Sequence, residues 1–186
     1  MNHFNFDKEW KDINYLIPIY DQWGGNSTQV SLTGGKNIII NNKTATVVKK
    51  LAKVFAVDLT QLKRKYGILV GRKTSTPLPL HPDLILIPVK IREPLAKDEG
   101  ARGYVLKNKI ADFRAIESAI TRFSFKDGTY LDCLQSLTSV NLSLAHAEII
   151  SRECTRNHQS ETVREREELY SVLAAVLGSL HKQHQD

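Results

Sequence analysis

With 186 residues, the chain is long enough for one domain of ordinary size or for a domain with a helical appendage. Its 41% hydrophobic and 25% charged residues exclude disorder of the whole chain, because they suffice to build a core. No apolar run approaches membrane-spanning length and the N-terminus lacks the layout of a secretory signal, so we expect a cytoplasmic protein without a membrane partner. Two cysteines, Cys133 and Cys154, favour reduced thiols over a disulfide framework.

Positive charge is concentrated in the middle of the chain. Residues 34–107 contain 15 Lys and Arg against 5 Asp and Glu, a local net charge of +10. Each flank, 1–33 and 108–186, carries a net charge of −2, so the middle accounts for the overall +6. The densest part, residues 43–73, holds nine basic residues and one acidic residue, Asp58. Such a block indicates a surface that meets a polyanion, and nucleic acid is the first partner to consider.

The first forty residues predict short strands. Apolar residues alternate or cluster over 13–20 and 29–32, and residues 37–40 form a compact apolar run. The pairs Gly24-Gly25 and Gly34-Gly35 supply the turns between these runs. We therefore expect a strand-rich N-terminal third.

Two helices are predicted inside the basic segment. Over residues 44–55 the apolar positions change to helical spacing, and the opposite face carries three lysines, Lys49, Lys50 and Lys53. Asp58 predicts the N-cap of a second, shorter helix, with Gln61 as its capping-box partner and Gly67 as the residue that ends it.

These two helices admit a helix-turn-helix interpretation. Ala52, Ala56 and Leu62 stand near the positions where that motif places a small residue, its turn and a packing residue of the second helix. Ala56 occupies the place where glycine is preferred. The second helix then presents four side chains to the major groove, namely Thr60, Gln61, Arg64 and Lys65. The alternative is an ordinary helix pair packed on a sheet.

The next segment predicts extended chain. Residues 68–70 are apolar and β-branched enough for a strand, and three prolines make 77–82 extended and irregular, because proline disfavours helix. Residues 84–91 predict a buried strand, and 97–102 a charged loop. Runs at 117–125 and 129–134 flank Asp127-Gly128, which predicts a β-hairpin.

The last fifty residues predict helices. Residues 138–151 form one, and the polar interval 152–160 separates it from an amphipathic helix with an apolar stripe over 169–180. Thr162 and Glu165 form a capping box for this last helix. Its stripe either packs on its own domain or meets a second copy or a partner. We thus expect an α+β domain over 1–150, with a mostly antiparallel sheet and two short helices in the basic segment, and a helical appendage over 151–186.

Enzyme motifs are poor in this sequence. Gly34-Gly35-Lys36 lacks the lead and the Ser or Thr of a phosphate-binding P-loop. His146 and Glu148 are two residues apart, so they do not make the i, i+4 pair that suits a metal on a helix, and Cys154 with His158 is at most half a metal site. We expect no catalysis, no metal and no cofactor.

The central region resembles the competence transcription factor family, ComK. The resemblance rests on an ordered set of pieces over about residues 15–150, most of the chain. After the strand-rich third come Tyr66-Gly67 and Gly71-Arg72-Lys73, the proline-rich stretch 77–88, a loop with an aromatic at 100–104, the hairpin 125–129 and the helical stretch 136–150. The helical segment before Tyr66 is longer than in that family, and the tail from Arg152 has no counterpart there.

The resemblance implies a transcriptional activator that recognises paired A/T-rich boxes of duplex DNA through the minor groove, as a homo-oligomer. The physical chemistry suits it, because the narrow groove of A/T tracts concentrates negative potential and attracts Arg and Lys. The predicted DNA contacts are Arg72 and Lys73. The supporting phosphate surface is expected at Lys63, Arg64, Lys65, Lys49, Lys50 and Lys53, with Arg92 and Arg102 completing the set.

Two rival functions stay open. An RNA-binding module is one, although the sequence lacks an aromatic-rich strand motif of the stacking type. A protein-interaction module is the other, with a basic face for an acidic partner and the terminal helix as its docking element.

Overall fold

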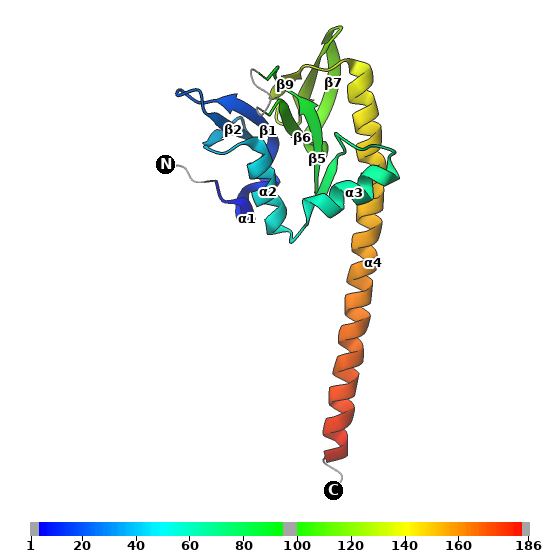
Figure 1. Cartoon of the computed structure of the whole chain (residues 1–186). Coiled ribbons are helices and arrows are strands. Elements are labelled where there is room, and N and C mark those ends of the chain that lie inside the picture. The colour runs from blue at the N-terminus through cyan, green and yellow to red at the C-terminus, as the bar shows by residue number, and fades with distance from the viewer. Residues whose placement is uncertain (1–3, 95–99, 184–186) are drawn as a thin grey trace. The chain divides into compact units, whose positions relative to one another are not determined.

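A computed structural model of the chain describes residues 4–94 and 100–183, with side chains at all of these except 161 and 172–183. The chain divides into two compact units, Met1–Ser151 and Arg152–Asp186. The described part of the first unit has an α+β fold with two antiparallel sheets, which confirms the expected fold class (Figure 1).

Six of the described strands form the larger sheet, in the order β3-β2-β1-β6-β5-β4. Each neighbouring pair is antiparallel. The strands are β1 (Ile13–Tyr20), β2 (Asn26–Leu32), β3 (Asn37–Ile40), β4 (Leu78–His81), β5 (Leu84–Lys90) and β6 (Arg102–Leu106). The sheet therefore has two halves, β1–β3 and β4–β6, which join where β1 pairs with β6. At this junction Tyr15 lies opposite Val105, and Leu16 lies opposite Tyr104.

The smaller described sheet has the order β7-β8-β9. It consists of β7 (Ile110–Glu117), β8 (Ile120–Phe125) and β9 (Tyr130–Cys133). The predicted hairpin at Asp127-Gly128 is confirmed, with Gly128 at a φ of +83°. The sequence predicted a single strand over 117–125. In the structure β7 ends at Glu117 and β8 starts at Ile120, so the prediction missed β7.

Helix α2 (Thr44–Val54) buries the predicted apolar stripe, since Val47, Val48 and Leu51 pack into one core cluster with residues of β1 and β2. Helix α3 (Leu59–Leu69) follows, and both short helices are where the sequence placed them. The turns α1 (Phe6–Glu9), η1 (Trp10–Asp12) and η2 (Lys107–Lys109) are too short to have a periodic signal.

The central strands of the larger sheet are buried on both faces. Along β5, Leu84 and Leu86 belong to the cluster that contains α2, whereas Ile85 and Ile87 belong to a second cluster with Phe123 of the smaller sheet. Successive side chains of a strand point to opposite faces of the sheet. Because both faces are buried at β5, its sequence is a continuous apolar run. The sheet is therefore the middle layer of the first unit.

Three local predictions between residues 67 and 104 are wrong in whole or in part. Gly67 does not end α3, and 68–70 is not a strand, because the helix continues to Leu69 and the chain turns at Gly71, at a φ of +66°. Gly67 has a packing role instead, since a Cβ there would lie 2.5 Å from the carbonyl oxygen of Arg72. The expected loop at 100–104 is also wrong in part, because Arg102 starts β6; residues 97–99 lie outside the described residues.

The C-terminal prediction of two helices is wrong as well. A single helix, α4, runs from Leu137 to Gln183 without the expected break at 152–160, which holds neither Gly nor Pro. Thr162 is not an N-cap, because its hydroxyl donates to the carbonyl of His158, 2.9 Å away, as a threonine inside a helix does.

Within the first unit, Val140, Ala147 and Ile150 of α4 are buried. In the second unit, Leu169 of the predicted stripe is exposed, and the stripe side chains from 173 to 180 lie outside the described ones. Among the described helices, none combines the length and apolar character needed to cross a membrane.

Candidate nucleic-acid interface

The start of α3 is fixed by Asp58. Its side-chain oxygen accepts hydrogen bonds from the backbone N–H groups of Thr60 and Gln61, at 2.6 and 3.0 Å, as the predicted cap requires. The bond from Gln61, followed by that from Thr60, lowers the pKa of the Asp58 carboxyl. In α3, all of which is described, the only buried residues are Tyr66 and Gly67. The helix therefore presents most of its surface, including Lys63, Arg64 and Lys65, to solvent.

The turn between α2 and α3 contains one residue in the left-handed region. Ala56 has a φ of +53°, in the left-handed region that favours glycine. The N–H of Val57 donates to the carbonyl of Ala52, at 3.0 Å, and Ala52 is only 1% exposed. Thr60, Gln61, Arg64 and Lys65 are all exposed on α3. Insertion of this helix into a major groove stays a prediction.

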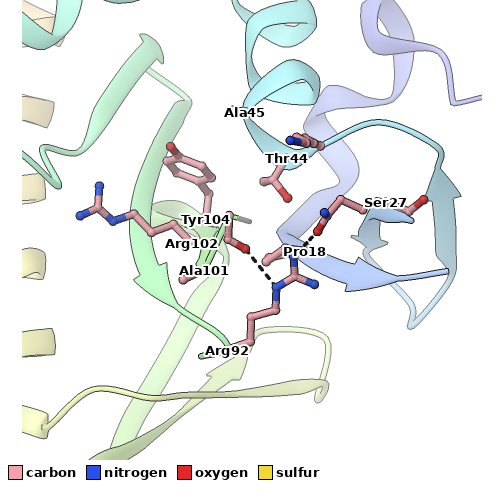
Figure 2. A pocket seen from close by; sticks show the side chains of 11 residues that line it. Pro18, Ser27, Thr44, Ala45, Arg92, Ala101, Arg102 and Tyr104 are labelled. Atoms are coloured by element: carbon pink, nitrogen blue, oxygen red, sulfur yellow. Dashed lines mark hydrogen bonds between the residues drawn. The ribbon is translucent and has the colours of Figure 1, made fainter. Parts of the chain in front are cut away.

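A basic groove forms where α2, α3 and the larger sheet meet. One hollow of about 480 Å³ is lined by residues that include Lys43, Thr44, Arg92, Arg102 and Tyr104 (Figure 2). A second hollow of about 180 Å³ is lined by residues that include Lys63, Lys73, Arg102 and Tyr104. Because Arg102 and Tyr104 line both, we treat the two as one feature, the Arg102 groove. Among its described lining residues there is no Asp or Glu.

Arg92 is built into the wall of this groove. Its Nε donates to the carbonyl of Gly100, 3.0 Å away, and one terminal nitrogen donates to Oδ1 of Asn26 (dashed lines in Figure 2). The guanidinium also lies 3.9 Å from the centre of the Tyr20 ring. Arg92 therefore supplies positive charge while its position is fixed by the protein.

Arg102 and Tyr104 lie two residues apart on β6, so their side chains share one face of the strand. Arg102 is exposed, whereas Tyr104 is half-buried, and burial raises the pKa of its hydroxyl against the opposing effect of Arg102. The two hollows therefore share one exposed guanidinium, that of Arg102, and the half-buried ring of Tyr104.

The structure separates the other predicted contacts into three groups. Arg72 is half-buried and does not line the groove; burial lowers the pKa of His146 on α4, and the charge of Arg72 lowers it further, so these two side chains are near each other. Arg64 and Lys65 line a shallow hollow along α3, with Ile68. Three exposed lysines occupy the outer face of α2: Lys49, Lys50 and Lys53.

Of the ten predicted contacts, the structure therefore brings four together in the groove: Lys63, Lys73, Arg92 and Arg102. Sequence reasoning missed two groove residues. Lys43 lay inside the densest basic stretch but was not selected, and Tyr104 was noted only as part of a motif. The spacing of Arg102 and Tyr104 was the available signal, and it went unused because the strand itself was read as a loop.

Metal and thiol chemistry find little support in the geometry. Within the described residues, no group of three or more His, Cys, Asp or Glu side chains is arranged to hold a metal ion. Cys133 is buried, and burial raises the pKa of its thiol to about 11, so it is a poor nucleophile.

No protein-family model matches this chain, and no curated protein matches it either.

Proposed function

We propose that this protein is a DNA-binding transcriptional regulator that contacts duplex DNA through the Arg102 groove. The observation that carries the proposal is the convergence of cations from separate elements. Lys43 directly precedes α2, Lys63 lies on α3, Lys73 follows α3, and Arg92 and Arg102 flank the β5–β6 connection. A groove with such a lining matches the negative charge of a phosphate backbone.

The resemblance to ComK extends this proposal to a cytoplasmic activator that prefers A/T-rich boxes read through the minor groove. An exposed arginine such as Arg102 suits a narrow minor groove, where negative potential is enhanced. The exposed cations Arg64 and Lys65 of α3 suit contacts to the adjoining backbone.

The RNA-binding alternative is less favoured by the fold. Single-stranded RNA is commonly bound on an open sheet face that carries stacking aromatics. The central strands β1 and β5 instead contribute buried residues to the core clusters on both faces of the larger sheet. Competition between single-stranded RNA and duplex DNA for the protein decides between the two partners.

Self-association through the second unit is part of the proposal. Leu169 and Tyr170 of α4 are 58% and 70% exposed, which favours a helix that meets a second copy. The double variant Leu169→Glu, Tyr170→Glu is expected to shift the protein to a smaller species in sedimentation velocity, whereas Arg166→Glu on the same helix is not. Equal sedimentation of both variants would contradict this part.

The test of DNA binding is fluorescence anisotropy with A/T-rich and G/C-rich duplexes of equal length across a salt series. We expect A/T preference, and a salt slope that falls by about 2 in the variant Arg102→Ala, Lys73→Ala, since each lost phosphate contact removes roughly 1 from the slope. Lys126→Ala is the matched control, because Lys126 is exposed on the β8–β9 turn and does not line the groove. Unchanged affinity and slope in the groove variant would overturn the assignment.

A further inference from the structure

The turn between β1 and β2 carries a tryptophan in solvent. Trp23 is 85% exposed, the highest value among the large hydrophobic side chains that the structure describes. Tryptophan is usually buried over most of its surface, so an indole held in water indicates a contact made outside the chain. Figure 1 shows this turn at the outer end of the β1–β2 hairpin.

The turn is held rigid by its own aspartate. Oδ1 of Asp21 accepts hydrogen bonds from the N–H groups of Trp23 and Gly25, at 2.9 and 2.8 Å. The backbone adds two more bonds between Asp21 and the glycines, at 2.9 and 3.0 Å. The Asp21 carboxylate packs closely on Gly25, since a Cβ there would lie 2.6 Å from Oδ2 and would have to displace it. The indole is thus displayed on an ordered backbone, and a partner would not bear the entropic cost of ordering the turn.

The same hairpin forms one wall of the Arg102 groove. Asn26 and Ser27, at the start of β2, line the larger hollow, and Asn26 accepts a hydrogen bond from Arg92. Trp23 is three residues from Asn26, within a reach of ~10 Å of chain. Trp23 itself does not line either hollow, so the indole can meet a polyanion only where that polyanion extends past Asn26 towards the hairpin tip.

Trp23 is the one aromatic residue of the turn itself. The other turn residues are Asp21, Gln22, Gly24 and Gly25, which add no apolar side chain. The nearest exposed aromatic in sequence, Tyr20, is 36% exposed and has the Arg92 guanidinium 3.9 Å from its ring centre. A protein-docking site is a wider patch, and a membrane-binding segment needs several apolar anchors. A single flat ring beside a cationic groove instead fits the space between two stacked base pairs.

We propose that Trp23 inserts its indole into bound duplex DNA as a stacking wedge, from the minor-groove side and at a flexible base step. This inference rests on the proposed function and adds its mode of contact. Apolar wedges of this kind partly unstack a step and bend the duplex, and flexible pyrimidine–purine steps such as TA cost least to open.

The chain allows a direct optical test, because it has two tryptophans. Trp10 packs against Phe55 and His81, with ring centres 5.1 and 5.4 Å apart. The variant Trp10→Phe leaves Trp23 as the sole reporter. We expect duplex DNA with a central TA step to quench the Trp23 emission severalfold and to protect the indole from quenching by acrylamide.

The affinity of Trp23→Ala gives a second test. This variant should bind DNA about 10-fold more weakly with an unchanged salt slope, because stacking is lost while the phosphate contacts remain. Ile116→Ala, which also removes an exposed apolar side chain, should bind normally.

The outcomes separate this inference from the function beneath it. If the protein binds DNA while Trp23 emission stays constant and Trp23→Ala binds normally, the wedge is overturned and the DNA-binding proposal stands. If neither wild type nor Trp10→Phe binds duplex DNA at low salt, both are overturned. A blue shift with anionic phospholipid vesicles and no response to DNA overturns the wedge in favour of a membrane contact. Should Trp10→Phe fail to fold, the difference in quenching between wild type and Trp23→Phe gives the same answer.

Discussion

Two hairpin turns of this protein share a design and differ in use. The β1–β2 turn and the β8–β9 turn each contain an aspartate and, after it, a glycine at positive φ, +76° at Gly24 and +83° at Gly128. Among the described residues, the bonds to the Asp21 carboxylate come from its own hairpin. The Asp127 carboxylate also accepts bonds from outside its hairpin, at 2.7 Å from Asn14 and 2.9 Å from the N–H of Gly34.

The two turns differ in the elements that pack against them. Asn14 belongs to β1 and Gly34 to the β2–β3 turn, so Asp127 joins the smaller sheet to the larger one. Asp21 has no such neighbour among its hydrogen-bond partners, and its bonds serve to hold Trp23 in place. The sequence of a turn determines its rigidity, whereas its tertiary neighbours determine whether that rigidity serves stability or display.

The largest effect that tests this comparison is expected from Asp127→Ala. Its removal takes the 2.7 Å acceptor from the buried Asn14 amide, which keeps only a 3.3 Å bond to Thr129, so the free energy of unfolding should fall by about 2 kcal/mol. Asp21→Ala should cost about 1 kcal/mol or less, because its donors are exposed. Urea denaturation of both variants measures the contrast, and equal losses would contradict it.

The pH dependence of stability offers a second test of the Asp127 contacts. Burial alone would raise the pKa of Asp127, but hydrogen bonds from Thr129, Asn14 and Gly34 outweigh it and lower the pKa from 3.8 to about 2. A depressed pKa contributes stability that is fully present above the unfolded value and is lost as the pH falls towards the folded one. The difference in unfolding free energy between wild type and Asp127→Asn should therefore be constant above about pH 5 and shrink towards pH 2. A difference that persists undiminished at acid pH would rule out this origin.

For DNA affinity we expect the opposite order, with Asp21 contributing more than Asp127. Asp21→Ala is expected to weaken binding about 3-fold, since the freed turn must be ordered again when Trp23 inserts. Asp127→Ala, measured where both variants are folded, should bind like wild type, because Asp127 lies outside the Arg102 groove. Anisotropy titrations with the same duplex measure both, and a larger loss in Asp127→Ala would reverse the comparison.

Local signals predicted much of the fold. Strands 13–20 and 37–40, the cap at Asp58 and the Asp127-Gly128 turn are all as expected, because each depends on residues adjacent in sequence. The end of α3 was misplaced because the role of Gly67 depends on the carbonyl of Arg72, which folds back against it. Strand β6 was missed because its pairing with β1 and β5 is non-local.

The sequence predicted the positive charge of the candidate site but not which side chains line the groove. The basic segment correctly contained the groove lysines, and helical geometry already implied that Lys63, Arg64 and Lys65 cannot share one face. The sequence did not show that Lys63 and Arg102 line one hollow, since this arrangement brings α3 next to β6. Nor did it show that the charge of Arg72 acts on His146 of α4 rather than in the groove. Trp23 carried no periodic signal, and its exposure became visible only with the turn around it.

The smallest predicted effect concerns a third turn, between α2 and α3, where the left-handed residue is not glycine. Ala56 has a φ of +53°, so Ala56→Gly should relieve backbone strain and raise the free energy of unfolding by about 0.5–1 kcal/mol, net of the greater flexibility of unfolded glycine. Gly128→Ala is the reverse substitution at a left-handed position, because Gly128 has a φ of +83° and no atom lies within 4 Å of an added Cβ. The variant should lose roughly 1 kcal/mol of unfolding free energy, and this loss would come from backbone strain alone. Urea denaturation of the pair should give opposite signs. A destabilised Ala56→Gly variant would mean that the methyl group of Ala56 contributes more through packing than its backbone strain costs.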